Sequence, residues 1–153
     1  GAFANRVDSQ AHGLELDLEQ SLSPGWKWIA AVAWTDPSGS PDGQSGEREI
    51  EGVARWTGSS GLLWTPSERH SLGLNWRFAD DRRGIPPDQP ERYDLLDFSY
   101  QHRGAFGSGS RISIGVQNLL DEQISYFLGS PNGLRVFPFE ERVLWLGVGW
   151  EGR

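Results

Sequence analysis

The chain has few residues that could do metal chemistry, because it contains no cysteine and only three histidines. They are His12, His70 and His102. Metal ligands usually recur at short spacings that bring them to one side of a helix or turn. These histidines fall on different expected strands or turns without such spacing. We therefore interpret them as surface or interface residues, and we expect no metal site and no cofactor.

Carboxylate pairs, a serine pair and a glycine-rich stretch are the other candidates for chemistry. The carboxylates at positions 80–81 and 140–141 flank long polar stretches, where they could bind a cation or could simply be solvated. The serines at 59–60 lack the strand-to-helix turn of a hydrolase nucleophile. Residues 104–109 are rich in glycine, but no helix follows that could bind phosphate, so a hairpin turn is expected. We therefore expect that the protein is not an enzyme.

The composition argues against nucleic acid and favours a membrane surface. The formal net charge is −7, whereas nucleic-acid binders present a basic face. The longest apolar run, residues 28–34, is far shorter than the roughly 20 residues of a membrane helix. Eight tryptophans are many for 153 residues, and tryptophan gathers at membrane–water interfaces. Methionine is absent even at position 1 and no signal peptide opens the chain, so we expect part of a longer protein.

Apolar and polar residues alternate along most of the chain, which predicts β-strands with two different faces. The apolar series are Leu14, Leu16 and Leu18; Trp26, Trp28, Ala30, Val32 and Trp34; Ile50, Ala54, Trp56, Leu62 and Trp64; Leu72, Leu74, Trp76 and Phe78; Leu96, Phe98 and Tyr100; Ile112, Ile114 and Val116; and Leu144, Leu146, Val148 and Trp150. This pattern predicts about seven strands and no helix. Strands of about nine to eleven residues would suit a tilted membrane crossing.

The connections between these strands alternate in length. Short connections are expected at residues 23–25, 65–69 and 104–109, and long ones at 37–48, 80–92 and 118–141. Membrane barrels have short periplasmic turns and long extracellular loops. Tryptophans would then lie toward both ends of the apolar face, as the two aromatic girdles of such a barrel do. The polar face would carry Glu15, Asp17, Lys27, Arg55, Asn75, Arg77, Asp97, Arg103, Arg111 and Gln117. We predict an all-β fold, an antiparallel up-and-down transmembrane β-barrel fragment of about seven or eight strands.

Three stretches of the chain resemble the TonB-dependent outer-membrane receptors. The stretch 110–122 alternates and then reads Asn118, Leu119, Leu120, Asp121, which is similar to the penultimate strand of that family and its Asn-Leu-Phe-Asp motif. Residues 141–150 are similar to the last strand, which ends in an aromatic residue, although this chain continues for three residues. Residues 12–18, followed by a Pro-Gly turn and an aromatic strand, extend the likeness over nearly the whole chain.

The resemblance implies active uptake of a scarce ligand, such as a ferric siderophore, across the Gram-negative outer membrane. The family barrel has about 22 strands around an N-terminal plug. Residues 1–153 would be one region of its C-terminal wall, without the plug, and would not transport anything alone. Implied partners are outer-membrane lipid, the remainder of the barrel, the plug, TonB through that plug, and the assembly machinery. The assembly signal would be the strand with Leu144, Leu146, Val148 and Trp150.

The aromatic residues of the last long connection are the candidates for ligand contact. They are Tyr126, Phe127, Phe137 and Phe139. Aromatic loop residues bind siderophores in receptors that the chain resembles, but these four could instead pack the loop against the barrel rim. Two other architectures remain open. One is a complete eight-stranded barrel with a structural or adhesive role, which needs a further strand within residues 1–10. The other is a soluble β-sandwich that binds a ligand.

Overall fold

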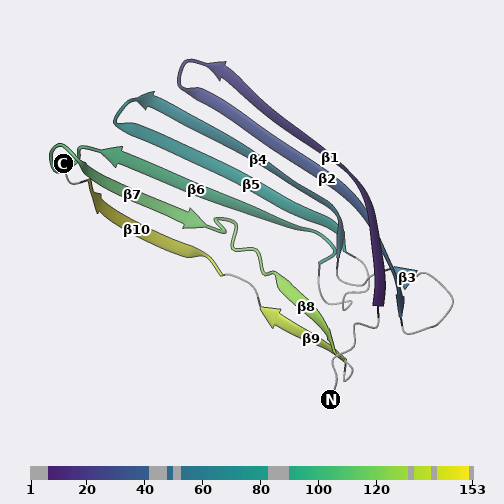
Figure 1. Cartoon of the computed structure of the whole chain (residues 1–153). Helices are drawn as coiled ribbons and strands as arrows, with labels where there is room; N and C mark the ends of the chain where they lie inside the picture. Colours follow the sequence, from purple (N-terminus) through teal and green to yellow (C-terminus); the bar gives the residue numbers. More distant parts are fainter. Residues whose placement is uncertain are drawn as a thin grey trace.

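The chain folds into β-strands joined by turns and loops, without a helix in its described part (Figure 1). This is a computed structural model that describes residues 7–41, 48–49, 53–82, 90–130, 133–138 and 141–151. The strands are β1 Val7–Ser23, β2 Trp26–Pro41, β3 Arg48–Glu49, β4 Ala54–Ser67, β5 His70–Arg82, β6 Tyr93–Arg103, β7 Ser110–Gln117, β8 Ser125–Ser130, β9 Gly133–Pro138 and β10 Val143–Trp150. Among the described residues, no helix has the length and hydropathy needed to cross a membrane.

Seven strands form one antiparallel sheet in the order β1-β2-β4-β5-β6-β7-β10, with the short β3 paired to the far end of β2. Neighbours in this sheet follow one another along the chain, apart from the excursion through β8 and β9. The prediction of an all-β, up-and-down antiparallel sheet of about seven strands is therefore confirmed. The sheet is open, because β1 and β10 do not pair. These two edge strands run in the same direction (Figure 1), so antiparallel closure would need further strands between them.

The first strands are longer than predicted. β1 has 17 residues and β2 has 16, and β2 continues through Pro41 instead of ending at a loop from residue 37. The extension forms because the start of β1 supplies a partner for it: Val7 lies opposite Pro41 and Gln10 opposite Ser38. Residues 7–10 therefore belong to β1, and they do not form the separate strand that a complete eight-stranded barrel would have needed.

The connection predicted at residues 118–141 contains a hairpin of its own, β8–β9, with Tyr126 opposite Phe137. All contacts between described strands join neighbours within one of the two sheets, so no second layer packs on the large sheet. Only Ala79, Leu95 and Ile124 are buried hydrophobic residues in the described part of the chain. A single layer exposes both of its faces, and it lacks the core that normally stabilises a soluble domain.

The short turns lie together at one end of the sheet, and β10 ends there as well (Figure 1). Backbone hydrogen bonds join each turn to the next. The Thr65 N–H donates to the Gly25 carbonyl at 2.7 Å, the Arg103 N–H to the Arg69 carbonyl at 2.8 Å, and the Glu151 N–H to the Gly109 carbonyl at 2.8 Å. The short-turn rim is therefore continuous across the sheet. The predicted separation of short and long connections is confirmed.

Candidate functional site

The strand register sorts the side chains onto two faces. Trp26 lies opposite Trp64, and Trp34 lies opposite Trp56, on what we call the apolar face. Further members of this face are Leu14, Leu16, Leu18, Trp28, Leu62, Leu72, Leu74, Trp76, Phe98, Tyr100, Ile114, Val116, Leu144, Leu146 and Val148. The polar face carries the residues between them, among them Glu15, Asp17, Lys27, Asn75, Arg77, Asp97, Arg103, Arg111 and Gln117. A period of two separates the two sets because successive strand residues point to opposite sides.

The apolar face is open to its surroundings. Leu144 is 75% exposed, Leu14 is 73% exposed and Leu146 is 71% exposed. Monomeric soluble proteins rarely expose apolar surface that is continuous over several strands. This face therefore needs a cover that the described residues do not supply.

Aromatic rings gather toward both ends of the apolar face. At the short-turn rim Trp26 stacks on Trp64 with 5.2 Å between ring centroids, and Phe106 stacks on Trp150 at 6.5 Å. Toward the long connections Trp76 stacks on Phe78 at 5.1 Å. Two aromatic bands that border an apolar zone are typical of a membrane-facing barrel wall.

A charged cluster at the long-connection end of β5 and β6 borders the second aromatic band. The Arg92 guanidinium pairs with Asp94 at 2.8 Å and with Asp80 at 3.4 Å, and it lies 5.4 Å from the Phe78 ring centroid. The hydrogen bond to Asp94 and the charge of that carboxylate raise the pKa of Arg92 above its usual range. The Trp76 indole N–H also donates to Asp94, at 2.9 Å. Asp80 therefore takes part in this pair instead of standing free as a cation ligand.

The fold brings two of the three histidines together. His70 lies opposite His102, their rings stack at 4.4 Å, and the His70 Nδ1 atom lies 2.8 Å from the Tyr100 hydroxyl. His12 lies on β1, opposite Asp36. Within the described ranges, no group of three or more His, Cys, Asp or Glu residues is placed to hold a metal ion.

Ion pairs between neighbouring strands balance much of the charge on the polar face. Arg77 pairs with Asp97 at 2.8 Å, and Lys27 pairs with Glu19 at 2.8 Å. Both pairs are partly exposed, so each contributes little to stability. Their charged groups are hydrated, so this face can contact water directly, as the inner wall of a water-filled barrel does.

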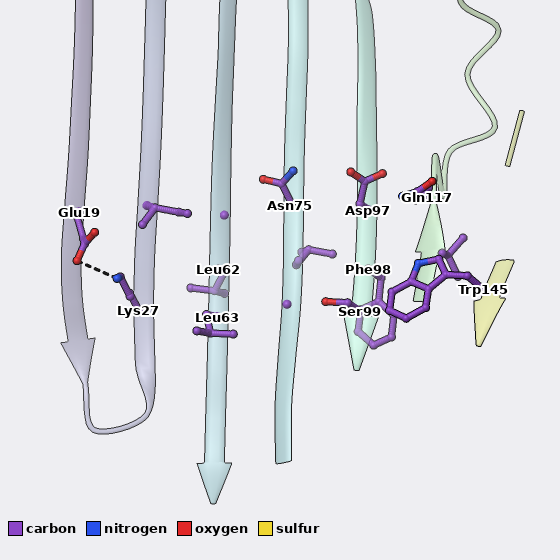
Figure 2. A pocket seen from close by; sticks show the side chains of 15 residues that line it. Glu19, Lys27, Leu62, Leu63, Asn75, Asp97, Phe98, Ser99, Gln117 and Trp145 are labelled. Atoms are coloured by element: carbon purple, nitrogen blue, oxygen red, sulfur yellow. Dashed lines mark ion pairs between the residues drawn. The ribbon is translucent and has the colours of Figure 1, made fainter. Parts of the chain in front are cut away.

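A hollow of about 580 Å³ on the polar face extends across the sheet from Glu19 on β1 to Trp145 on β10 (Figure 2). Asn75, Asp97 and Gln117 line one edge side by side, and the Glu19–Lys27 ion pair lies at one end (Figure 2). Most of the other lining residues are apolar, among them Ile29, Leu63 and Trp145. Such a mixture of apolar surface and a few converging polar groups is typical of a ligand site.

Trp145 is the member of this hollow that the sequence analysis missed. It lies between Leu144 and Leu146 and therefore on the opposite face from them, with its indole over Gly115 and directed toward Ser99 (Figure 2). A Cβ atom on Gly115 would lie 2.5 Å from the indole. The sequence does show an aromatic residue at a polar-face position and a glycine at residue 115. It does not show the strand register that makes them partners.

The motif Asn118–Asp121 forms a tight turn after β7, in which Asn118 is buried. Asn118 is 2% exposed and has a φ of 50°, in the left-handed region. Its side chain closes the turn on Glu122: Nδ2 donates to the Glu122 carbonyl and Oδ1 accepts from the Glu122 N–H, both at 2.9 Å. Its backbone N–H donates to Asp97 at 3.0 Å, which links the turn to the polar face. Leu119 and Leu120 are exposed, as is Asp121.

Asn118→Ala is expected to lower the free energy of unfolding by about 2 kcal/mol. Alanine removes both side-chain hydrogen bonds from a turn in which Asn118 is buried, and it tolerates a positive φ less well than asparagine. The measurement is the urea midpoint of the variant against the parent chain. Asn75→Ala is the matched control because no hydrogen bond holds the Asn75 side chain in the described structure, and it should change the midpoint little. Equal losses in the two variants would contradict a special role for Asn118.

The aromatic candidates for ligand contact fall into the β8–β9 hairpin. Tyr126 and Phe127 lie on β8 and Phe137 on β9, with Tyr126 and Phe137 as register partners. Phe139 and Glu140 lie outside the described residues, as does Ile50. Leu144, Leu146, Val148 and Trp150, for which the resemblance implies an assembly signal, share the exposed apolar side of β10.

The comparisons with known proteins leave this arrangement without an assigned family: no protein-family model matches the chain, and a search of curated proteins finds no match.

Proposed function

We propose that the chain is a section of an outer-membrane β-barrel wall, and that the barrel belongs to a TonB-dependent receptor that imports a scarce ligand such as a ferric siderophore. The observation that carries the membrane part is the single-layer sheet with an exposed apolar face between two aromatic bands. The resemblance around residues 110–122 and 141–150 supports the receptor part. The chain itself would serve as wall and would have no catalytic role.

Lipid is the cover that fits the apolar face best. Trp26 and Trp34 are eight residues apart, so their rows are separated by roughly 27 Å along the strand. A strand tilt of about 40° reduces this to roughly 20 Å across the membrane, close to the roughly 25 Å apolar band of known barrels. Each inner strand of the sheet is hydrogen-bonded to a strand on either side, which suits the hydrocarbon interior, where unpaired backbone groups are costly.

The polar face would then line the lumen. Its ion pairs and amide side chains would tolerate water, and the hollow beside Trp145 would face whatever occupies the barrel. The open edges of β1 and β10 support the interpretation of the sheet as a section of a larger barrel wall, because unpaired edges promote aggregation unless other strands cover them.

The two alternatives fit the described residues less well. A β-sandwich buries one face of each sheet against another, and no second layer contacts this sheet. A complete eight-stranded barrel needs one more strand between β10 and β1, and residues 7–10 are already part of β1.

Single cysteines test the proposal, because the natural chain has none. Leu16→Cys and Asp17→Cys place one thiol on each face of β1 at the same depth. With the chain refolded into lipid vesicles and each thiol carrying a polarity-sensitive fluorophore, the label at 16 should emit at shorter wavelength and be quenched by brominated lipid. The label at 17 should be quenched by aqueous iodide instead. Identical behaviour of the two labels would refute a membrane wall.

A further inference from the structure

Three arginines lie close together along the backbone of the short-turn rim. Arg103, at the end of β6, is the register partner of Arg111 at the start of β7. The Arg103 N–H donates to the carbonyl of Arg69 at 2.8 Å, so Arg69 flanks it on the other side. The fold therefore brings the backbones of three arginines together: Arg69 in the turn between β4 and β5, Arg103 on β6 and Arg111 on β7.

No carboxylate neutralises these arginines in the described part of the chain. Arg77, Arg92 and Arg142 all form ion pairs there, whereas Arg69, Arg103 and Arg111 form none. The chain has 21 acidic residues and only 14 basic ones, so carboxylate partners are abundant in its composition. Like charges directly opposite one another destabilise a sheet. A bound anion would remove this penalty.

A hollow of about 370 Å³ opens beside two of the arginines. Arg69 and Arg103 line it, together with Thr65, Ser67 and Ser71 and with Gly25, Glu68 and His70. The Thr65 hydroxyl donates to the Gly25 carbonyl at 3.2 Å, whereas the Ser67 hydroxyl oxygen accepts from the Arg69 N–H at 3.3 Å and keeps its own proton to donate. The volume lies within the usual range for small-ligand sites. One carboxylate, that of Glu68, also lines the hollow and would weaken the attraction for an anion without cancelling two arginines.

The guanidinium groups of Arg103 and Arg111 contact different neighbours. The Arg103 Nε atom donates to Gln101 at 3.3 Å, along its own strand. The Arg111 guanidinium lies over Gly149 on β10, where an added Cβ would be 3.4 Å from its Nη2 atom. Both contacts are exposed and weak, so either side chain can turn toward a ligand with little loss.

We propose that this hollow binds a small, multiply charged oxyanion bearing phosphate or carboxylate groups. Arg69 and Arg103 would bind it directly, and Arg111 would approach from β7. The planar guanidinium matches both kinds of oxyanion with two parallel hydrogen bonds. The site lies at the turn end of the sheet, where Arg103 and Ser71 come from the polar face and His70 from the other face.

Calorimetric titration of the full chain, in the buffer or detergent in which it folds, tests the site. Pyrophosphate and citrate are the probes, with sodium chloride at matched ionic strength as the blank. At least one probe should bind, and the stronger of the two identifies phosphate or carboxylate as the preferred group. Arg103→Gln should weaken binding at least tenfold. Arg142→Gln, which removes the same charge far from this rim, should change it less than twofold. Absence of binding by both probes, or equal losses in the two variants, would overturn the proposal.

Thermal unfolding of the Arg111→Gln variant gives an independent measurement. If the arginines are kept for a ligand, removing one should raise the unfolding temperature of the empty chain at low salt, because a like-charge pair disappears. The same variant should lose most of the stabilisation that the bound anion gives the parent chain. A purely structural role predicts the reverse, namely a lower unfolding temperature without ligand, and that result would also overturn the proposal.

Discussion

Leu146→Arg should lower the free energy of unfolding of the membrane-inserted chain by about 2–4 kcal/mol. Leu146 lies on the apolar face of β10, four residues before Trp150 and therefore roughly 14 Å along the strand from the short-turn rim. An arginine there would have to enter the hydrocarbon or distort the bilayer around it. In water the same substitution would change stability by at most about 0.5 kcal/mol, since the leucine is already 71% exposed.

Gly147→Arg is the matched control for this substitution, because it adds the same charge one residue further along the same strand. Gly147 points to the polar face, and a Cβ there meets nothing closer than the Ser113 Cβ at 3.8 Å. Its arginine can extend into water, so the free energy of unfolding should change by less than about 1 kcal/mol. Urea unfolding in lipid vesicles, followed by tryptophan fluorescence, measures both variants. A small effect of Leu146→Arg in vesicles would contradict the assignment of this face to lipid.

The two faces could be predicted from the sequence because a period of two fixes which side of a sheet each residue occupies. Leu144, Leu146 and Val148 alternate with glycines and one tryptophan, so their common face follows without knowledge of the partner strand. The positions of short connections could also be predicted, because residues such as Pro24 and Gly25 favour a tight turn. Gly25 adopts the positive φ of 80° that such a turn needs.

Pairings between distant strands could not be predicted, because they depend on the stagger that each turn imposes. Arg103 and Arg111 are eight residues apart, and a shift of the 104–109 turn by one residue would have separated them. His70 and His102 come together only through the register of β5 with β6. The length of β2 was misjudged for a related reason. Its continuation to Pro41 depends on β1 extending far enough to pair with it.

The hollow beside Trp145 shows the same dependence on register. The sequence places a tryptophan on the polar face at position 145 and a glycine at 115, thirty residues earlier. Only the pairing of β7 with β10 makes them partners. The missing side chain of Gly115 provides the space in which the indole lies against the sheet. This complementarity leads to the second large effect expected of a single substitution.

Gly115→Val should destabilise the chain by about 3 kcal/mol or more, because overpacking of a site without free space costs this much when the backbone must also move. Gly115 is buried, and its added Cβ would lie 2.5 Å from both the Cε2 and Cζ2 atoms of Trp145. It would also lie 2.7 Å from the carbonyl oxygen of Phe98, a backbone atom that cannot turn aside. The clash therefore displaces the indole and separates β6 from β7.

Gly147→Val is the control for the loss of a glycine from the same sheet face. Its Cβ has ordinary contacts only, at 3.8 Å and beyond, and valine suits a strand better than glycine. The free energy of unfolding should therefore stay within about 0.5 kcal/mol of the parent or rise. The double variant Gly115→Val with Trp145→Ala should recover part of the loss, because it removes the indole clash and keeps the clash with Phe98. Additive losses in the double variant would mean that Trp145 does not rest on Gly115, and the hollow would then lack its aromatic wall.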